Sequence, residues 1–238
     1  MRLCILVIAS HSRKYDELIH LWRTIKYPDC VKLYFVFADP DAPTMISVTG
    51  DMITVRGKEC ICPGILYKTR AAMEYLLKHE EFDYLLRSNL SSFFNVEHLL
   101  KFLKDMPRTN AMFGQLMFER FLSGSGYIMT PDIIQRFLDW DFSEEFNPMR
   151  VYDDDIVGKF MTLHDIPRFT WTMEDARDLK DEDAIQIRCH VAIEDIWFNG
   201  LELVYSSASP DYFRIQVERY NARICTRLDT SDQVGEQK

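Results

Sequence analysis

The stretch from Glu81 to Phe94 reads Glu-Phe-Asp-Tyr-Leu-Leu-Arg-Ser-Asn-Leu-Ser-Ser-Phe-Phe, and it decides the expected fold. It begins as an apolar run typical of a buried strand and then breaks into small polar residues. A helix is predicted directly after it, with Asn95 as N-cap and an apolar stripe of Val96, Leu99, Leu100 and Leu103. The turn from Arg87 to Ser92 therefore follows a strand at the edge where open α/β sheets place their ligands.

Strands and helices alternate along the first half of the sequence. Arg2 to Ala9 and Val31 to Ala38 are predicted strands that each end in a polar loop, and an amphipathic helix lies between them. A short strand at Met52 to Val55, a helix after Gly64 and the strand Phe82 to Leu86 follow. This alternation predicts the α/β class, with one Rossmann-like domain, a mostly parallel central sheet and helices on both faces.

Composition and charge set the bounds on this domain. With 47% apolar residues among 238, the chain can bury a large core, and we expect one domain over residues 1–229 and a disordered polar tail over 230–238. The net charge of −9, without clustered Lys or Arg, excludes a general nucleic-acid binder. The apolar run Leu3 to Ala9 is far shorter than the roughly 20 residues of a spanning helix. We therefore expect no membrane span, no signal peptide and a soluble, cytoplasmic protein.

Two motifs of the second half carry residue types suited to chemistry. A predicted strand contains Ser123-Gly-Ser-Gly-Tyr127, and Asp153-Asp-Asp155 begins a predicted helix. Glycines within a strand also mark bulges, and an Asp at a helix start also serves as an N-cap, so each motif has a structural interpretation beside the functional one.

Four short motifs follow one another in a familiar order: Tyr67-Lys-Thr69, Leu86 to Phe93, Ser123 to Tyr127 and Asp153-Asp-Asp-Ile-Val-Gly158. Over residues 1–165 this order resembles the beta-1,3-galactosyltransferase-like glycosyltransferases of the A fold (GT-A). That family has a Lys-containing helix, an Asp-X-Asp strand end, a Ser-Gly-Gly-Gly-Tyr strand and an acidic helix start. This chain departs from it at Asn89-Leu-Ser91, where the family usually has acids.

The resemblance implies a hexosyltransferase that moves a sugar from a nucleotide-sugar donor, such as a UDP-sugar, to a glycan or another hydroxyl acceptor. The expected lack of a membrane anchor departs from the secretory members of that family and suggests a viral or bacterial setting. The donor-binding residues expected from strand ends and motif positions are Ser10, Arg13, Asp39, Lys68, Arg87, Asn89, Ser91, Gly124, Gly126, Tyr127 and Arg188. Asp39 is the leading candidate for the base and ribose. For the cationic residues, a solvated surface charge or a structural ion pair is the alternative.

The replacement of acids by Asn89-Leu-Ser91 affects how strongly the site could hold a divalent metal. Asn89 and Ser91, with His190 on a late strand, are neutral ligands that would hold Mn²⁺ or Mg²⁺ more weakly than two acids would. We therefore expect weak or absent metal dependence, with positive side chains sharing the stabilisation of the leaving phosphates. His190 could equally be an ordinary strand histidine.

The acidic helix start supplies a candidate base for an inverting transfer. Aligned on Gly158, Asp154 falls on the acid proposed as base in the resembled family, with Asp153 beside it. One alternative is an inactive protein of the same fold that binds a nucleotide or sugar, which the loss of acids at Asn89-Leu-Ser91 favours. A third is a metal-dependent phosphotransfer enzyme, although no Gly-rich phosphate loop accompanies the Asp triplet.

Overall fold

The computed structural model describes residues 1–61, 63–143, 153–175, 184–198 and 201–235. Its strands are β1 Leu3–Ile8, β2 Val31–Asp39, β3 Ile46–Thr49, β4 Met52–Arg56, β5 Tyr84–Asn89, β6 Ser92–Phe94, β7 Met112–Met117, β8 Phe121–Met129, β9 Arg168–Thr170, β10 Met173–Asp175, β11 Gln186–Arg188, β12 His190–Phe198 and β13 Leu201–Ala208. Its helices are α1 Arg13–Thr24, α2 Gly64–His79, α3 Val96–Leu103, α4 Pro131–Asp139, α5 Asp153–Leu163 and α6 Pro210–Gly235.

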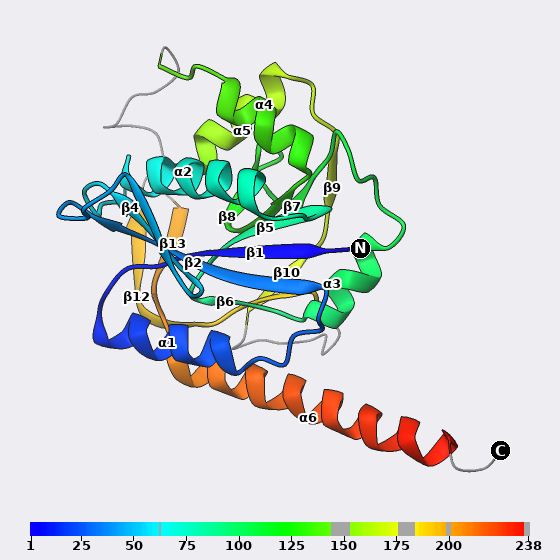
Figure 1. Cartoon of the computed structure of the whole chain (residues 1–238). Helices are drawn as coiled ribbons and strands as arrows, with labels where there is room; N and C mark the ends of the chain where they lie inside the picture. The colour runs from blue at the N-terminus through cyan, green and yellow to red at the C-terminus, as the bar shows by residue number, and fades with distance from the viewer. Residues whose placement is uncertain (62, 144–152, 176–183, 199–200, 236–238) are drawn as a thin grey trace.

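An eight-stranded mixed sheet forms the centre of the molecule (Figure 1), with the strand order β3-β4-β2-β1-β5-β8-β7-β9. The four strands β4, β2, β1 and β5 run parallel, in agreement with the predicted alternation of strands and helices. The α/β class is therefore confirmed. A mostly parallel sheet is not confirmed, because β8 runs against both of its neighbours, β5 and β7, and β3 runs against β4.

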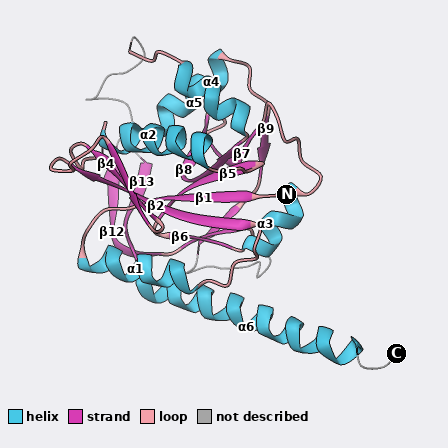
Figure 2. Cartoon of the chain, in the orientation of Figure 1, coloured by secondary structure: helices cyan, strands magenta, loops and turns pink. Residues whose placement is uncertain are grey.

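Helices cover both faces of this sheet (Figure 2), as expected from the sequence. Leu3, Ile5 and Val7 of β1 belong to the core beneath α1, α3 and α6, whereas Cys4, Leu6 and Ile8 belong to the core beneath α2, α4 and α5. A strand that is buried on both faces has to be continuously apolar, which explains the unbroken run in β1. Within the described part of the chain, none of the helices combines the length and apolar character needed to cross a bilayer.

The late strands return to the polar end of β5. Strand β6 pairs with β11, so that Ser92 lies opposite Arg188, and the Cys189 N–H donates to the Ser91 carbonyl over 2.8 Å. A separate hairpin of β12 and β13 leads into α6, which packs on α1. Helix α6 extends to Gly235, past Thr230, where the sequence predicts the start of a polar tail; residues 236–238 lie outside the described part.

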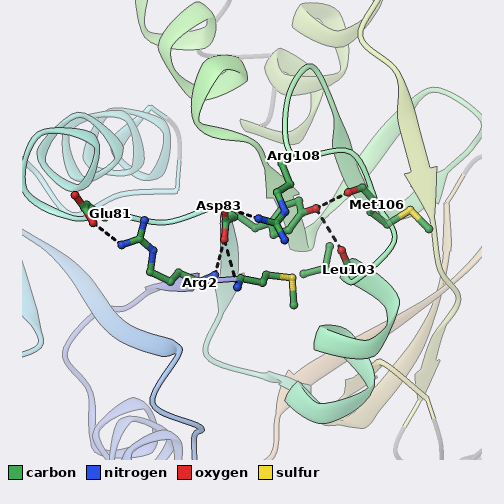
Figure 3. Close-up of polar contacts among 8 residues, drawn as sticks. Arg2, Glu81, Asp83, Leu103, Met106 and Arg108 are labelled. Carbon is green, nitrogen blue, oxygen red and sulfur yellow. Dashed lines mark hydrogen bonds and ion pairs between the residues drawn. The ribbon is translucent and has the colours of Figure 1, made fainter.

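Polar contacts join the segments at the amino-terminal ends of β1 and β5, the ends opposite to the polar end of β5 (Figure 3). Asp83 accepts a hydrogen bond from the Arg2 backbone N–H at 2.6 Å, and the Arg108 guanidinium approaches the other carboxylate oxygen at 3.5 Å. The Tyr84 hydroxyl donates to the Met106 carbonyl at 2.8 Å, which fixes the loop after α3. These contacts tie structural segments together, and the residues predicted for function lie at the other edge.

Candidate functional site

A cleft of about 590 Å³ opens at the carboxyl edge of β1 and β5. Segments far apart in the sequence meet there: the strand ends of β1 and β5, helix α2, the glycine-containing half of β8, the start of α5 and the late strands. The predicted site residues that line it are Ser10, Lys68, Arg87, Asn89, Ser91, Gly124, Asp153, Asp154, Arg188 and His190. Tyr15, Glu59, Met117, Met173 and Ser207 also line it and were not predicted from the sequence.

Four other predicted residues lie outside the lining. Arg13 is the exposed first residue of α1, and the exposed Asp39 accepts a hydrogen bond from the Asp41 N–H at 2.9 Å within its own turn. Gly126 packs against the Phe94 ring, which leaves no room for a Cβ. Tyr127 is buried, with the Arg87 guanidinium 5.5 Å from its ring centroid. In this structure Gly126 and Tyr127 support the cleft from within the core.

Gly124 makes direct contact with the acidic helix start. Its backbone N–H donates to Asp154 Oδ2 at 2.9 Å, and a Cβ at this position would lie 2.5 Å from Asp154 Oδ1. Any side chain at residue 124 would therefore displace the carboxylate. The glycine in this strand is explained by that close approach of a carboxylate to the backbone.

The position of Asp154 changes its acidity. Burial, together with the neighbouring Asp153 carboxylate, raises the pKa of Asp154 from 3.8 to about 6, while Arg87 and the Gly124 N–H act in the opposite direction. A carboxyl group with this pKa is ionised above pH 6 and accepts a proton more readily than an exposed Asp does. Asp154 thus has the acidity of a general base that works near neutral pH.

This raised pKa predicts a pH-dependent stability. Between about pH 4 and 6 the native carboxyl keeps its proton while the unfolded one loses it, so the free energy of unfolding falls as the pH rises through this window. We expect Asp154→Asn to be more stable than wild type at pH 7.5 by roughly 1–3 kcal/mol, and the gain to vanish near pH 4. Thermal midpoints of both proteins across this range measure it, and a pH-independent difference would contradict the prediction.

Arg87 joins three elements at the floor of the cleft. From β5, its guanidinium donates to Asp153 Oδ2 on α5 at 2.6 Å and to the Gly124 carbonyl on β8. Its side chain is 4% exposed and that of Asp153 11%, so this is a buried ion pair. Arg87 therefore fixes the acidic helix start relative to β8, where the Asp154 carboxylate is bonded.

Lys68 occupies a comparable position on the other wall. This side chain from α2 is 2% exposed, and its ammonium donates to the Ala9 carbonyl at 2.7 Å and to Glu59 Oε1 at 2.6 Å. Glu59 also accepts a hydrogen bond from the Ala38 N–H at 3.1 Å. Burial lowers the pKa of Lys68, and Glu59 offsets part of that effect. An ammonium has three N–H donors, and these two bonds use two of them.

The residues predicted as weak metal ligands do come together. The Asn89 side-chain oxygen accepts hydrogen bonds from Ser91 Oγ at 3.2 Å and from Ser92 Oγ at 2.9 Å, and His190 Nε2 lies 2.7 Å from Ser91 Oγ. None of the three carries a negative charge, whereas Mg²⁺ and Mn²⁺ sites are built on carboxylates. Among the described residues, no group of three His, Cys, Asp or Glu side chains could hold a metal ion. This donor set does not fit a divalent cation.

Comparison of the sequence with protein-family models and with curated proteins finds no match in either case.

Proposed function

We propose that this chain is a glycosyltransferase that moves a sugar from a nucleotide-sugar donor, such as a UDP-sugar, to a hydroxyl group of a glycan or similar acceptor. The observation that carries the proposal is the meeting of four sequence motifs in one cleft. Lys68, the polar end of β5, Gly124 and Asp154 come from segments up to 86 residues apart, counted from 68 to 154, and all line the same cavity. A cavity with convergent polar groups and a carboxyl of raised pKa is typical of an active site.

Asp154 serves as the general base in this proposal. An acceptor oxygen attacks the anomeric carbon, its proton passes to the Asp154 carboxylate, and the bond from that carbon to the phosphate oxygen breaks. The bonding electrons leave with the nucleoside diphosphate. The Gly124 N–H donates a hydrogen bond to Asp154 Oδ2, so the carboxylate keeps a fixed orientation during proton transfer. Attack opposite to the leaving group inverts the configuration at the anomeric carbon.

Positive side chains stabilise the departing phosphates. The third N–H of Lys68 is a suitable donor to a phosphate oxygen, and Arg188 lines the same cleft beside His190. Charges held in a partly closed cavity act more strongly on a leaving group than they would in bulk water. In this scheme the Lys68 and Arg188 side chains stabilise the phosphate charge that a divalent metal would otherwise stabilise.

Removal of metal provides a direct prediction. Because Asn89, Ser91 and His190 supply no charge to a divalent cation, we expect transfer in excess EDTA to stay within about twofold of the untreated rate. Lys68→Met should lower the transfer rate far more than EDTA does. Initial rates with and without EDTA, followed by addition of Mn²⁺, measure this effect. Loss of transfer on chelation with recovery on Mn²⁺ alone would overturn the metal-independent scheme.

A panel of nucleotide sugars tests the function itself. Ligands that bind only the native state raise the thermal midpoint, by an amount that grows with concentration over Kd. We expect one donor class to raise it and then to be converted when hydroxyl acceptors are added. Stabilisation without donor consumption under any acceptor would favour a non-catalytic nucleotide or sugar binder, and no stabilisation by any donor would contradict both functions. One observation favours the non-catalytic binder. The Asn89 side-chain oxygen already accepts hydrogen bonds from Ser91 and Ser92, so it is not available as a metal ligand.

A further inference from the structure

The turn that joins β7 to β8 is conformationally unfavourable. Phe118 and Glu119 are the central residues of a turn within the three-residue connection 118–120, in which the Arg120 N–H donates to the Met117 carbonyl at 2.9 Å. Their φ angles are +50° and +57°. Hairpin turns with two positive φ angles strongly favour Asn and Gly, and a bulky aromatic residue is rare in this region. Strain of this kind persists where the surroundings hold it and is concentrated at functional sites.

The register of the sheet places this turn beside the cleft. Ser88 pairs with Gly126, so β5 ends next to Ser125 while β8 continues back to Phe121. At about 3.3 Å per residue, the hairpin extends roughly 13 Å beyond the end of β5. Met117, Ser123, Gly124 and Ser125 of this extension line the cleft. The hairpin therefore forms one wall of the cavity.

Helix α5 holds the hairpin in place. A Cβ on Gly158 would lie 2.5 Å from the Phe121 Cβ, so the strand and the helix are in close contact there. The same helix begins with Asp153 and Asp154. The tip of the hairpin thus has a fixed position relative to the proposed base.

Phe118 places an aromatic ring in solvent at this fixed position. The residue is 83% exposed, and its ring centroid lies 6.2 Å from that of Phe121. A ligand that covered this ring would remove apolar surface from water, which is energetically favourable. The turn lies on the far side of β5 from β1, which supplies Ser10 to the proposed donor side.

We propose that Phe118 is a stacking platform for the carbohydrate acceptor. The C–H groups on one face of a sugar ring are apolar and pack flat on an aromatic ring, while its hydroxyls remain free for the base and for water. This proposal rests on the proposed transferase function and assigns a residue of its acceptor site. Phe118 directly follows Met117, which lines the cleft that contains Asp154, so a sugar stacked on its ring would lie at the rim of that cleft.

Three variants test the platform. Phe118→Asn removes the ring and suits the positive φ, Glu119→Asn changes the neighbouring residue but keeps the ring, and Phe118→Trp keeps an aromatic surface. The acceptors are methyl glycosides of common hexoses and their disaccharides, used with the donor identified by thermal shift. Acceptor KM, donor hydrolysis without acceptor, and donor-induced thermal shift are measured for each protein.

We expect Phe118→Asn to raise the acceptor KM about fivefold, with donor hydrolysis and donor-induced shift unchanged. Glu119→Asn and Phe118→Trp should keep a KM within about twofold of wild type. If wild type transfers and Phe118→Asn has an unchanged KM, or Glu119→Asn shows the same rise, the platform is wrong and the transferase function stands. If wild type neither hydrolyses the donor nor transfers it, the function fails and the platform with it.

Discussion

Asp154→Asn should lose transfer by roughly 10²–10⁴-fold while it still binds the donor, because the variant keeps the size of the side chain and removes the proton acceptor. The Asn side-chain oxygen can still accept the Gly124 N–H that now bonds Asp154 Oδ2 at 2.9 Å. The start of α5 should therefore keep its position. Initial rates at saturating donor, together with donor affinity from thermal shift, measure the two effects separately.

Asp155→Asn is the matched control for this prediction. Asp155 lies in the same first turn of α5 and is absent from the cleft lining, so its variant should keep most of the transfer rate. Near-normal turnover in Asp154→Asn would reject Asp154 as the base. The expected gain in stability above pH 6 means that lost activity could not be attributed to unfolding. A product that retains the anomeric configuration of the donor, seen by NMR, would reject the inverting scheme.

Arg87→Met should lower the free energy of unfolding by about 3–5 kcal/mol, since it leaves the buried Asp153 carboxylate without its counter-charge. The pair is joined at 2.6 Å, and both side chains are largely shielded from water. Methionine fills a similar volume, so the loss reflects charge and hydrogen bonding more than a cavity. Urea denaturation at pH 7.5 measures the change.

Two further variants identify the cause of this destabilisation. The double variant Arg87→Met with Asp153→Asn should recover most of the lost stability, because no uncompensated charge remains. Arg23→Met removes a partner of Asp51 in a pair of similar length whose Arg side chain is 42% exposed, and it should cost about 1 kcal/mol or less. A double variant as unstable as Arg87→Met would show that the guanidinium acts through packing.

The sequence predicts best those elements whose pattern depends on local chemistry. β1 is a continuous apolar run because both faces of the sheet are covered, and β5 is apolar from Tyr84 to Leu86. Asn95 caps α3 by accepting a hydrogen bond from the His98 N–H. The predicted turn from Arg87 to Ser92 is wrong in its bounds, because Arg87 to Asn89 are the last residues of β5 and Ser92 begins β6. Most of this polar stretch does line the cleft, as expected for a strand end in an open α/β sheet. Helix α5 begins at the Asp triplet, which is where the sequence places it.

Contacts between residues far apart in the chain could not be predicted from the sequence. The hydrogen bond from Gly124 to Asp154 joins residues 30 positions apart. This contact explains why residue 124 is a glycine, which local sequence patterns do not. Glu59 was missed because it lies in a loop without periodicity, and only the fold brings it to Lys68. Asp39 is the last residue of β2, at the expected edge, but its carboxylate bonds within its own turn, outside the cleft.

The ion pair between Arg87 and Asp153 also sets an order of assembly during synthesis. Asp153 follows Arg87 by 66 residues, which at about 5–20 residues per second is a delay of roughly 3–13 s on the ribosome. During that interval the parallel half of the sheet can form, but β5 has a cation without its partner. The counter-charge Asp153 and the proposed base Asp154 are added together, before Arg188, His190 and Ser207, which also line the cleft. A chain that stalls before residue 153 therefore carries Arg87 without its counter-charge and lacks the proposed base.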